Sequence, residues 1–494
     1  MVCAGLFHAD RGGSALAPLP HCILGRPTNR SVNLIDFDAF VKTYDVRGLV
    51  DIELTDEIIE AFGAGFADEL ALAGKALVVG HDMRDSSPRF AAAFAKGATL
   101  RGADVRLIGL CSTDMTYFAS GKYELPAAMF TASHNPASYN GIKFSRELAR
   151  GISMDTGLAN IRDRAKAFLE SGIQTAAEVG RVSELDVRSD YAGYMHELVD
   201  LRSIRPLKIV VDAANGMGGY TVPLVLQGQG LPIEIVEMYF ELDGSFPNHE
   251  ANPLDPKNLV DLQARVKAEN ADLGLAFDGD ADRCFAVDEK GELVSPSALA
   301  AIVSKREIER VKSLGEEDIV VLHNLLTSRS VEEVIAAAGA KPVRTKVGHS
   351  LIKDQMAETG AVFGGEHSAH HYFRDFWGAD NGMLAALHLI SELGSGTEPM
   401  SQISARYTPY FSSGEINSTV DDRAAAIARL KSAFPDAEVE EFDGLTFSST
   451  SDSWWWFNVR PSNTEPLLRL NAESNHEALM VEIRDKAIKA IRNS

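Results

Sequence analysis

Residues 273–287, LGLAFDGDADRCFAV, place a dense acidic motif between two apolar runs. The runs LGLAF and CFAV predict two buried strands. Between them Asp278, Asp280 and Asp282 recur at every second position, so they share one face of a strand or converge in a tight loop. Three carboxylates this close repel one another unless a cation lies between them, and hard oxygen ligands favour Mg²⁺ or Ca²⁺. The stretch therefore predicts a metal-binding loop, against the plainer alternative of a solvated acidic loop.

An EF-hand is a second interpretation of the same carboxylates. Asp278, Asp280, Asp282 and Glu289 stand at positions one, three, five and twelve of such a loop. Position six of an EF-hand loop is a glycine, and here it is Arg283. The flanking runs also predict strands where an EF-hand has helices. These two differences argue against an EF-hand.

Strand-like apolar runs alternate with helix-like segments through most of the chain. Further runs of this kind are KALVVG (75–80), DVRLIGL (104–110), PLKIVVDAANG (206–216), DIVVLHN (318–324) and AVFGGEHS (361–368). The alternation predicts doubly wound α/β layers. One helix can be delimited, because Ser87 suits its N-cap, Pro88 its first helical position and Gly102 its end.

The pattern changes after about residue 406. Strands of a smaller α+β domain are predicted by YFSSGEINSTV (410–420), LTFSS (445–449) and WWWFNVR (454–460), and an amphipathic helix follows. We therefore expect a tail and four domains. The expected parts are a mobile N-terminal tail (1–30), three α/β domains (31–182, 183–291 and 292–406) and an α+β domain (407–494).

The composition narrows the classes of function. The 494 residues include 48 basic and 70 acidic ones, for a net charge of −22. This charge argues against bulk attraction to nucleic acid or to an anionic membrane. A phosphate-bearing ligand must therefore meet a local basic pocket, since distant charges are screened beyond about 8 Å. The four cysteines have no disulfide or zinc spacing, no apolar run approaches the roughly 18 residues of a membrane span, and the first 30 residues show no secretory pattern. We expect a cytoplasmic protein with reduced thiols.

Three further motifs follow or end apolar runs. TASHNP (131–136) predicts Ser133 on a loop at a strand tip, with its hydroxyl exposed. GEHSAHH (365–371) gathers a carboxylate, a hydroxyl and imidazoles, which suits zinc or a polyol. RPSNTEP (460–466) combines a guanidinium, hydroxyls and an amide, which suits a phosphate. Each motif alone also fits an ordinary polar loop.

Together the motifs resemble a known family. In chain order they are YDVRG, TASHNP, NGIK, DGDADR, VGHS, GEHSAH and RPSNTEP. This set and order resemble the α-D-phosphohexomutases, most closely the bacterial phosphomannomutase/phosphoglucomutase branch, over roughly residues 42–475. The resemblance implies four domains around a central cleft, three similar α/β domains and a smaller α+β C-terminal lid.

The resemblance also implies how the reacting groups are held. Ser133 matches the serine that carries the phosphoryl group, and His134 matches a neighbour that orients the site. Asp278, Asp280 and Asp282 match the ligands of one Mg²⁺, with a phosphoserine oxygen on Ser133 completing the set.

Proton transfer and charge stabilisation are assigned in the same way. Lys143 of NGIK matches the candidate general base, and Arg47 and the metal beside it could lower its pKa. His349 and His370 are alternative proton carriers. Arg283 would help the metal neutralise the phosphoryl oxygens.

Substrate contacts are expected from three segments. Glu366 and Ser368 match residues that bind the 3- and 4-hydroxyls of the sugar, and Lys346 is expected to contact the substrate. The distal phosphate is expected to meet Arg460, Ser462, Asn463 and Thr464. The sugar loop departs from the family, which often has Met where His367 stands and Gly where Ala369 stands.

The implied reaction uses hexose phosphates and a hexose 1,6-bisphosphate, which is both intermediate and activator. GEHSAHHYF looks more like the phosphomannomutases, so we expect interconversion of mannose 6-phosphate and mannose 1-phosphate. A phosphoglucomutase or a dual-specificity enzyme is the nearest alternative, and a Ca²⁺- or sugar-phosphate-binding protein that kept the fold is the non-enzymatic one. A monomer or weak homodimer is expected, without nucleic-acid or membrane partners.

Overall fold

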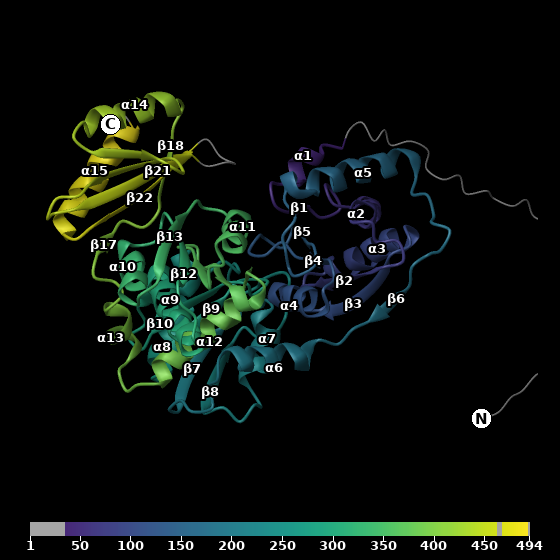
Figure 1. Cartoon of the computed structure of the whole chain (residues 1–494), viewed down its shortest axis with the longest axis horizontal. Coiled ribbons are helices and arrows are strands. Elements are labelled where there is room, and N and C mark those ends of the chain that lie inside the picture. Colours follow the sequence, from purple (N-terminus) through teal and green to yellow (C-terminus); the bar gives the residue numbers. More distant parts are fainter. Residues whose placement is uncertain (1–34, 462–466, 493–494) are drawn as a thin grey trace, which may run out of the picture. The chain divides into compact units, whose positions relative to one another are not determined.

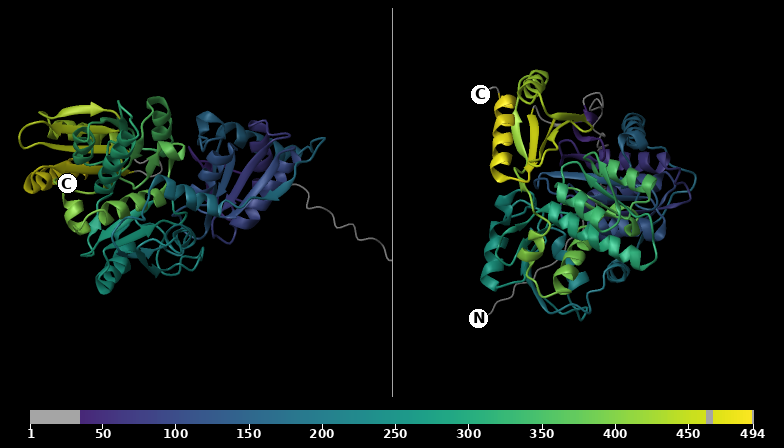
Figure 2. Two further views of the ribbon diagram at one scale, coloured as in Figure 1. Left: turned by 60° about the horizontal axis from the view of Figure 1, so that its bottom comes forward. Right: turned by 60° about the vertical axis from the view of Figure 1, so that its left-hand side comes forward.

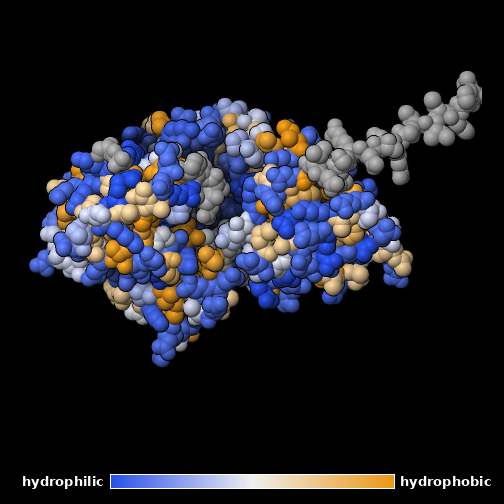
Figure 3. Space-filling view, turned by 90° about the horizontal axis from the view of Figure 1, so that it is seen from above, coloured by the Kyte–Doolittle hydropathy of each residue, from blue (hydrophilic) through white to orange (hydrophobic). Residues whose placement is uncertain are grey.

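The computed structural model describes residues 35–461 and 467–492, and the side chains of residues 349 and 350 are outside this description. In this part of the chain four β-sheets follow one another, with helices between their strands (Figure 1). The predicted mobile tail, residues 1–30, lies outside the described residues. Every helix within the described ranges is too short or too polar to span a lipid bilayer. Hydrophilic residues cover most of the face drawn in Figure 3.

The first sheet has six strands in the order β1-β5-β4-β2-β3-β6. Strands β2, β3, β4 and β6 are parallel, and β5 runs antiparallel between β4 and β1. Its strands are β1 (Val46–Leu49), β2 (Ala76–His81), β3 (Asp104–Leu110), β4 (Ala127–Phe130), β5 (Tyr139–Ser145) and β6 (Val182–Glu184). Its helices are α1 (Phe37–Phe40), α2 (Asp56–Glu69), α3 (Ser87–Leu100), α4 (Thr113–Tyr123) and α5 (Leu158–Ser171), with a 3₁₀ turn at Met154–Thr156.

Helix α3 starts one residue earlier than predicted. Ser86 stands at the N-cap position, and Ser87 is the first helical residue. The Ser87 hydroxyl donates to the buried carboxylate of Asp82 at 2.6 Å. It therefore does not cap the helix. Gly102, with φ of +85°, follows the helix as expected.

The second sheet has the order β11-β10-β9-β7-β8, with β8, β7 and β9 parallel and β10 and β11 antiparallel. Its strands are β7 (Leu207–Asp212), β8 (Ile233–Met238), β9 (Leu273–Phe277), β10 (Cys284–Asp288) and β11 (Leu293–Val294). Its helices are α6 (Arg188–Leu198), α7 (Gly218–Leu226) and α8 (Val260–Glu269), with a 3₁₀ turn at Pro256–Leu259.

The third sheet repeats this plan in the order β13-β12-β14-β15-β16, with β13, β12 and β14 parallel. Its strands are β12 (Val320–Asn324), β13 (Lys341–Thr345), β14 (Phe363–Gly365), β15 (His371–Phe373) and β16 (Ala379–Asp380). Its helices are α9 (Pro296–Ser313), α10 (Arg329–Ala337), α11 (His349–Thr359), α12 (Gly382–Gly394) and α13 (Met400–Ala405), with a 3₁₀ turn at Arg374–Phe376.

Three of the motifs occupy the same place in these three sheets. In each sheet a parallel strand is followed directly by an antiparallel neighbour, and the motif is the loop between them. TASHNP follows β4, DGDADR joins β9 to β10, and GEHSAH joins β14 to β15. The acidic motif is therefore a loop and not a strand face. This shared placement was not visible in the sequence, which has no repeat at the level of residues.

The fourth sheet is antiparallel in the order β17-β22-β21-β20-β19, with β18 also paired to β22. Its strands are β17 (Phe411–Ser412), β18 (Ile416–Thr419), β19 (Glu438–Glu441), β20 (Leu445–Ser449), β21 (Trp455–Pro461) and β22 (Leu467–Ser474). Helices α14 (Arg423–Ala433) and α15 (Glu477–Arg492) pack against each other beside it (Figure 2). We call this part the C-terminal domain. Its buried apolar residues form a cluster separate from the one that joins the first three sheets.

Candidate active site

The TASHNP loop holds its serine in a strained backbone conformation. Ser133 has φ of +50°, in the left-handed region that side chains with a Cβ seldom adopt. Its N–H donates to Thr131 Oγ1 at 2.9 Å. Arg84 is 2% exposed and donates at 2.7–3.0 Å to four carbonyl oxygens around this loop, those of Ser133, Asn135, Pro136 and Tyr139. These contacts fix the serine before any ligand arrives.

The prediction that Ser133 is exposed is wrong. The residue is only 5% exposed, because the loop is packed against the acidic loop of the second sheet. Its hydroxyl nevertheless lines a cavity of about 200 Å³, together with Arg47, Lys143 and His370. Ser133 Oγ lies 3.1 Å from both His134 Nδ1 and Asp278 Oδ2, and donates to the latter.

The acidic loop reaches the serine because it contains a glycine. A Cβ on Gly279 would stand 2.4 Å from the Ser133 carbonyl oxygen, closer than any contact can be. Asp278, Asp280 and Asp282 are each at most 1% exposed, and each offers a carboxylate oxygen within 4.8 Å of the others. The loop thus presents a buried acidic triad beside the serine hydroxyl.

The triad fits a divalent cation. Asp280 Oδ2 accepts from Thr113 Oγ1 at 2.6 Å and from Lys143 Nζ at 2.7 Å, and Asp282 Oδ2 accepts from Lys143 at 2.6 Å. The Oδ1 atoms of Asp280 and Asp282 are buried without a hydrogen-bond partner among the described residues. Buried carboxylate oxygens are costly unless they are paired, so these two atoms suit a hard cation such as Mg²⁺.

The EF-hand alternative does not fit the structure. Strands β9 and β10 flank the loop on both sides. Glu289, the twelfth position, accepts from the Ser401 N–H at 2.9 Å and also binds the Ser401 hydroxyl. Its carboxylate is therefore engaged elsewhere.

Arg283 fixes the ionisation of its neighbours. Its Nε–H donates to Asp278 Oδ2 at 2.9 Å, and its Nη2 lies 2.7 Å from His134 Nδ1. A guanidinium has only donors, so His134 Nδ1 is an acceptor and this ring is neutral. Burial, Arg283 and Arg47 together hold the pKa of His134 well below its usual range.

Among the protein groups alone, the pKa of Lys143 does not shift in the direction expected beside a bound metal. Burial alone would lower its pKa, but the adjacent carboxylates of Asp280 and Asp282 outweigh burial and hold the pKa well above the usual range. Arg47, the other cation expected to act on it, is engaged by Asn135 Oδ1 at 2.7 Å and Asp45 at 2.6 Å. As placed here, Lys143 is a cation bridging two members of the triad.

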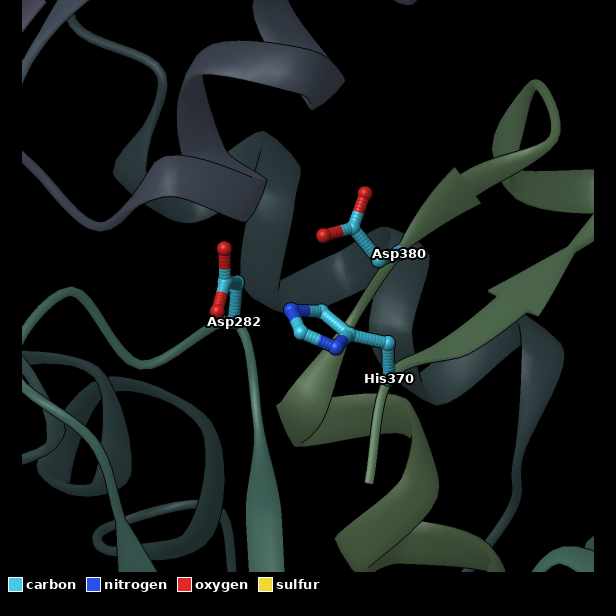
Figure 4. Close-up of side chains that lie close together, drawn as sticks. All are labelled: Asp282, His370 and Asp380. Atoms are coloured by element: carbon cyan, nitrogen blue, oxygen red, sulfur yellow. The ribbon is translucent and has the colours of Figure 1, made fainter. Parts of the chain in front are cut away.

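Side chains of the third sheet join Asp282 in a second cluster of titratable groups in the cavity. Asp282, His370 and Asp380 converge with ligand atoms within 4.8 Å, and Figure 4 shows the His370 ring turned toward Asp282. Lys353 Nζ lies 2.5 Å from Asp380 Oδ1 and 4.3 Å from the Tyr117 ring centroid. Sequence reasoning missed Lys353 and Asp380, because neither belongs to a recognisable motif and only the fold pairs them.

The sugar-loop residues are held by their own domain. Glu366 is 2% exposed and accepts from the Tyr372 hydroxyl at 2.8 Å and from Asn324 Nδ2 at 3.2 Å, and burial raises its pKa. Ser368 Oγ lies 2.9 Å from His370 Nδ1. Among the described residues that line the Ser133 cavity, His370 is present and Glu366 and Ser368 are not.

The imidazoles of this loop do not form a zinc site. His370 contacts Ser368, whereas His367 Nδ1 lies 2.9 Å from the Ser297 hydroxyl. His371 stacks on Phe363, with ring centroids 5.8 Å apart. The three rings thus have separate partners and do not bind one ion together, although His370 belongs to the group with Asp282 and Asp380 that could hold a metal ion.

The predicted phosphate-binding residues are described only in part. Arg460 on β21 lies opposite Arg469 on β22, and both guanidiniums are 3.4 Å from Glu415. Lys346 Nζ is 5.8 Å from the Phe442 ring centroid. Ser462, Asn463 and Thr464 lie outside the described residues, as does the side chain of His349 at the start of α11. Arg469 was not predicted, since only the strand pairing places it beside Arg460.

A fixed serine hydroxyl, a buried acidic triad and surrounding cations define a phosphoryl-transfer site. Four family models match the chain in order: the phosphoglucomutase/phosphomannomutase α/β/α domains I, II and III at residues 39–169, 189–291 and 295–410, and the C-terminal domain at 415–490. The chain therefore belongs to the phosphoglucomutase/phosphomannomutase family, and the predicted four-domain architecture is confirmed.

Individual relatives agree with the family models. A protein named phosphohexose mutases from Xanthomonas campestris pv. campestris is 40% identical over 453 residues, which cover 90% of this chain and 97% of the relative. The phosphomannomutase of Salmonella montevideo is 37% identical, over 92% and 98% of the two chains. A crystal structure of a family protein from Burkholderia thailandensis matches with a TM-score of 0.80 at 30% identity, over 93% and 98%. The chain is thus an enzyme of the phosphohexomutase class, an isomerase that moves a phosphoryl group.

Proposed function

We propose that the enzyme is a phosphomannomutase that interconverts mannose 6-phosphate and mannose 1-phosphate through a phosphoserine at position 133. The observation that carries this proposal is the Ser133 hydroxyl, 3.1 Å from Asp278, in a cavity whose lining includes the cations Arg47, Lys143 and Lys353. Several relatives at 35–40% identity, named phosphomannomutase or phosphohexose mutases, support the choice of reaction.

The first transfer moves the phosphoryl group from Ser133 to a sugar hydroxyl. The bond between Ser133 Oγ and phosphorus breaks, and a bond between the sugar oxygen and phosphorus forms. Asp278, Asp280, Asp282 and an oxygen on Ser133 would hold one Mg²⁺, which neutralises charge on the phosphoryl oxygens when bound. Arg283 and the protonated Lys143 add positive charge to the same wall.

The sugar hydroxyl must lose its proton during this transfer. The predicted acceptors are Lys143, His349 and His370, and the group that takes the proton returns it in the reverse step. Lys143 is protonated where it bridges Asp280 and Asp282, which favours His370 over it as the acceptor. His370 lines the cavity and its Nδ1 is held by Ser368. This contact orients the ring toward the reacting groups.

The second transfer completes the isomerisation. A hexose 1,6-bisphosphate forms, turns over within the site and gives its other phosphoryl group back to Ser133. Glu366 and Ser368 would bind the 3- and 4-hydroxyls in both orientations. Arg460 would bind the phosphate that is not being transferred, with Ser462, Asn463 and Thr464.

Glucose phosphates are the second candidate substrates. Mannose and glucose differ at C2, and the residues assigned to the sugar read C3 and C4. A loop that reads only shared hydroxyls would accept both epimers. Dual specificity therefore follows from the same assignment.

Two measurements test the proposal. Intact mass should show one added phosphate on the enzyme, present in the exposed-loop control Ser138→Ala and absent from Ser133→Ala. Coupled assays with mannose 1-phosphate and glucose 1-phosphate should show turnover with mannose 1-phosphate at least equal to that with glucose 1-phosphate. An active enzyme that carries its phosphate on another residue would refute the assignment of Ser133.

A further inference from the structure

The C-terminal domain is fastened to the start of helix α10 by a buried carboxylate. Glu473 on β22 is 2% exposed, and its Oε2 accepts from the backbone N–H of Arg329 at 3.0 Å. Arg329 is the first residue of α10, where backbone N–H groups lack partners within the helix and the helix dipole favours an anion. The contact therefore ties the C-terminal domain to the N-terminal end of α10, beside the third sheet.

A second contact meets the same carboxylate oxygen. Trp456 lies directly opposite Glu473 in the β21–β22 pair and donates its indole N–H to Glu473 Oε2 at 2.9 Å. The Arg329 guanidinium lies 4.7 Å from the Trp454 ring centroid. One end of the β21–β22 pair is thus fastened to α10.

The other end of the same strand pair bears Arg460, the proposed phosphate ligand, beside Arg469. Arg460 and Arg469 are paired four residues along β21 and β22 from Trp456 and Glu473. At about 3.3 Å per residue, that is roughly 13 Å. A small rotation at Glu473 would therefore displace the guanidiniums.

The fastening continues from α10 to the sugar loop. The backbone N–H of Ser328, the N-cap of α10, donates to Ser297 Oγ at 3.0 Å. Ser297 Oγ also contacts His367 Nδ1 at 2.9 Å. His367 lies between Glu366 and Ser368. It shares the wall of a cavity of about 40 Å³ with Ser297, Ser328, Trp456 and Glu473.

Polar contacts, and not a shared apolar core, join the two parts within the described residues, and the Val347 N–H adds one more by donating to Asp443 at 2.9 Å. The apolar cluster of the C-terminal domain is separate from the cluster of the first three sheets within the described residues. Apolar packing is non-directional, whereas hydrogen bonds to one buried carboxylate fix an orientation.

We propose that Glu473 and His367 are positioning residues that hold the phosphate-binding strands β21 and β22 at a set angle to the sugar loop. The inference rests on the proposed function, in which the sugar loop and Arg460 grip the two ends of one ligand. A set angle lets both ends be held together, so that the bisphosphate stays bound while it turns over.

The first test compares Glu473→Gln with a matched control, Glu440→Gln. Glu440 also pairs with the third sheet, through Arg344, but the two side chains of this pair are 40% and 48% exposed. Glutamine keeps an acceptor oxygen for Arg329 and Trp456 but removes the negative charge, so both hydrogen bonds should weaken. Glu473→Gln should therefore raise KM for mannose 1-phosphate about fivefold. It should also raise release of bisphosphate per turnover, with kcat changed much less. Trp456→Phe, which removes only the indole N–H, should act in the same direction.

The second test couples the two ends of the proposed connection. His367→Met and Glu473→Gln should be non-additive in KM, because they interrupt one chain of contacts. A double variant whose KM rises by the product of the two single-variant factors would overturn the proposal. So would a Glu473→Gln variant with a lower melting temperature whose KM and bisphosphate release equal those of the control.

The third test does not use the reaction. Spin labels at the exposed positions Ser313 and Ser432, after replacement of Cys3 and Cys22 by serine, report the distance between α9 and α14. Glu473→Gln should broaden the distance distribution, and Glu440→Gln should leave it unchanged. Equal distributions in the two variants would overturn the proposal. A wild type without mutase activity would refute the proposed function alone.

Discussion

The charged groups around Ser133 and those at the Arg460 end of β21 differ in how closely they are paired and how deeply they are buried. Around Ser133 the carboxylates of Asp278, Asp280 and Asp282 are at most 1% exposed, and each has a cationic partner at 2.6–2.9 Å. At the end of β21, Arg460 and Arg469 share one partly exposed carboxylate at 3.4 Å.

This difference separates chemistry from recognition. Groups that act on a developing charge are most effective when they are already fixed, because no reorganisation is needed during the reaction. Cations that bind a phosphate need N–H donors that can change partners, since a bidentate contact to the phosphate replaces their earlier contacts. The residues around Ser133 are therefore preorganised, and under the proposed function Arg460 would exchange Glu415 for a phosphate.

Removing the Ser133 hydroxyl should have the largest effect on activity. Ser133→Ala should lower kcat by about 10³-fold or more, as expected when a covalent nucleophile is lost. Its melting temperature should stay near that of the wild type, because the backbone contacts of Arg84 and Thr131 do not use the hydroxyl. A steady-state assay with thermal unfolding checks both, and wild-type activity would contradict the role of Ser133.

Removing the metal should rank second. A chelator should reduce turnover at least about a hundredfold, and Mg²⁺ should restore it, because three buried carboxylates without a cation misplace the phosphoryl group. Ca²⁺ should bind yet support little turnover, since its coordination is looser. Titration calorimetry should show weaker Mg²⁺ binding to Asp282→Asn. Turnover unaffected by the chelator would contradict the metal assignment.

The parts of the site that the sequence could predict are those that lie in one continuous motif. Ser133 and the three aspartates were found because each motif carries its chemistry within a few residues. Arg84 and Thr113 were missed because their partners, Ser133 and Asp280, are 49 and 167 residues away. The two carboxylates that raise the pKa of Lys143 were missed for the same reason, since they come from another domain.

The fold was predicted to a similar extent. The apolar runs at β2, β3, β7, β9, β12 and β21 are strands, as expected. Their periodicity reports burial, which is a local property. The antiparallel strands that follow β4, β9 and β14 depend on pairing with their neighbours, so the shared position of the three motif loops appeared only in the structure.

The rigid side of the comparison depends on Arg84. Arg84→Met leaves Asp82 without its cationic partner and four carbonyl oxygens without their donor, so it should cost about 3–5 kcal/mol of unfolding free energy. The control Arg89→Met removes ion pairs to Asp51 and Asp56 that are 40–66% exposed, and should cost less than about 1 kcal/mol. Urea unfolding checks both. Equal losses would show that the Ser133 loop is not held by Arg84.

Substitution of Arg460 should change substrate binding and leave the free energy of unfolding nearly unchanged. Arg460→Ala should raise KM by roughly ten- to thirtyfold, because a charge-assisted contact to a phosphate is lost. Unfolding free energy should change little, since the long contact to Glu415 contributes little. Kinetics with mannose 1-phosphate, together with urea unfolding, separate the two effects. An unchanged KM would remove Arg460 from the phosphate site.

The smallest expected effect concerns the choice between epimers. Glu366→Gln should lower kcat/KM for mannose 1-phosphate and glucose 1-phosphate by similar factors, so that their ratio changes by no more than about twofold. The reason is that Glu366 is assigned to hydroxyls on C3 and C4, which the two sugars share, while the epimers differ at C2. Glutamine keeps the shape of the side chain and its contacts with Tyr372 and Asn324, which limits the change to the lost charge. A ratio shifted tenfold or more would mean that Glu366 senses C2, and the sugar loop would then be the specificity determinant instead of a grip common to both substrates.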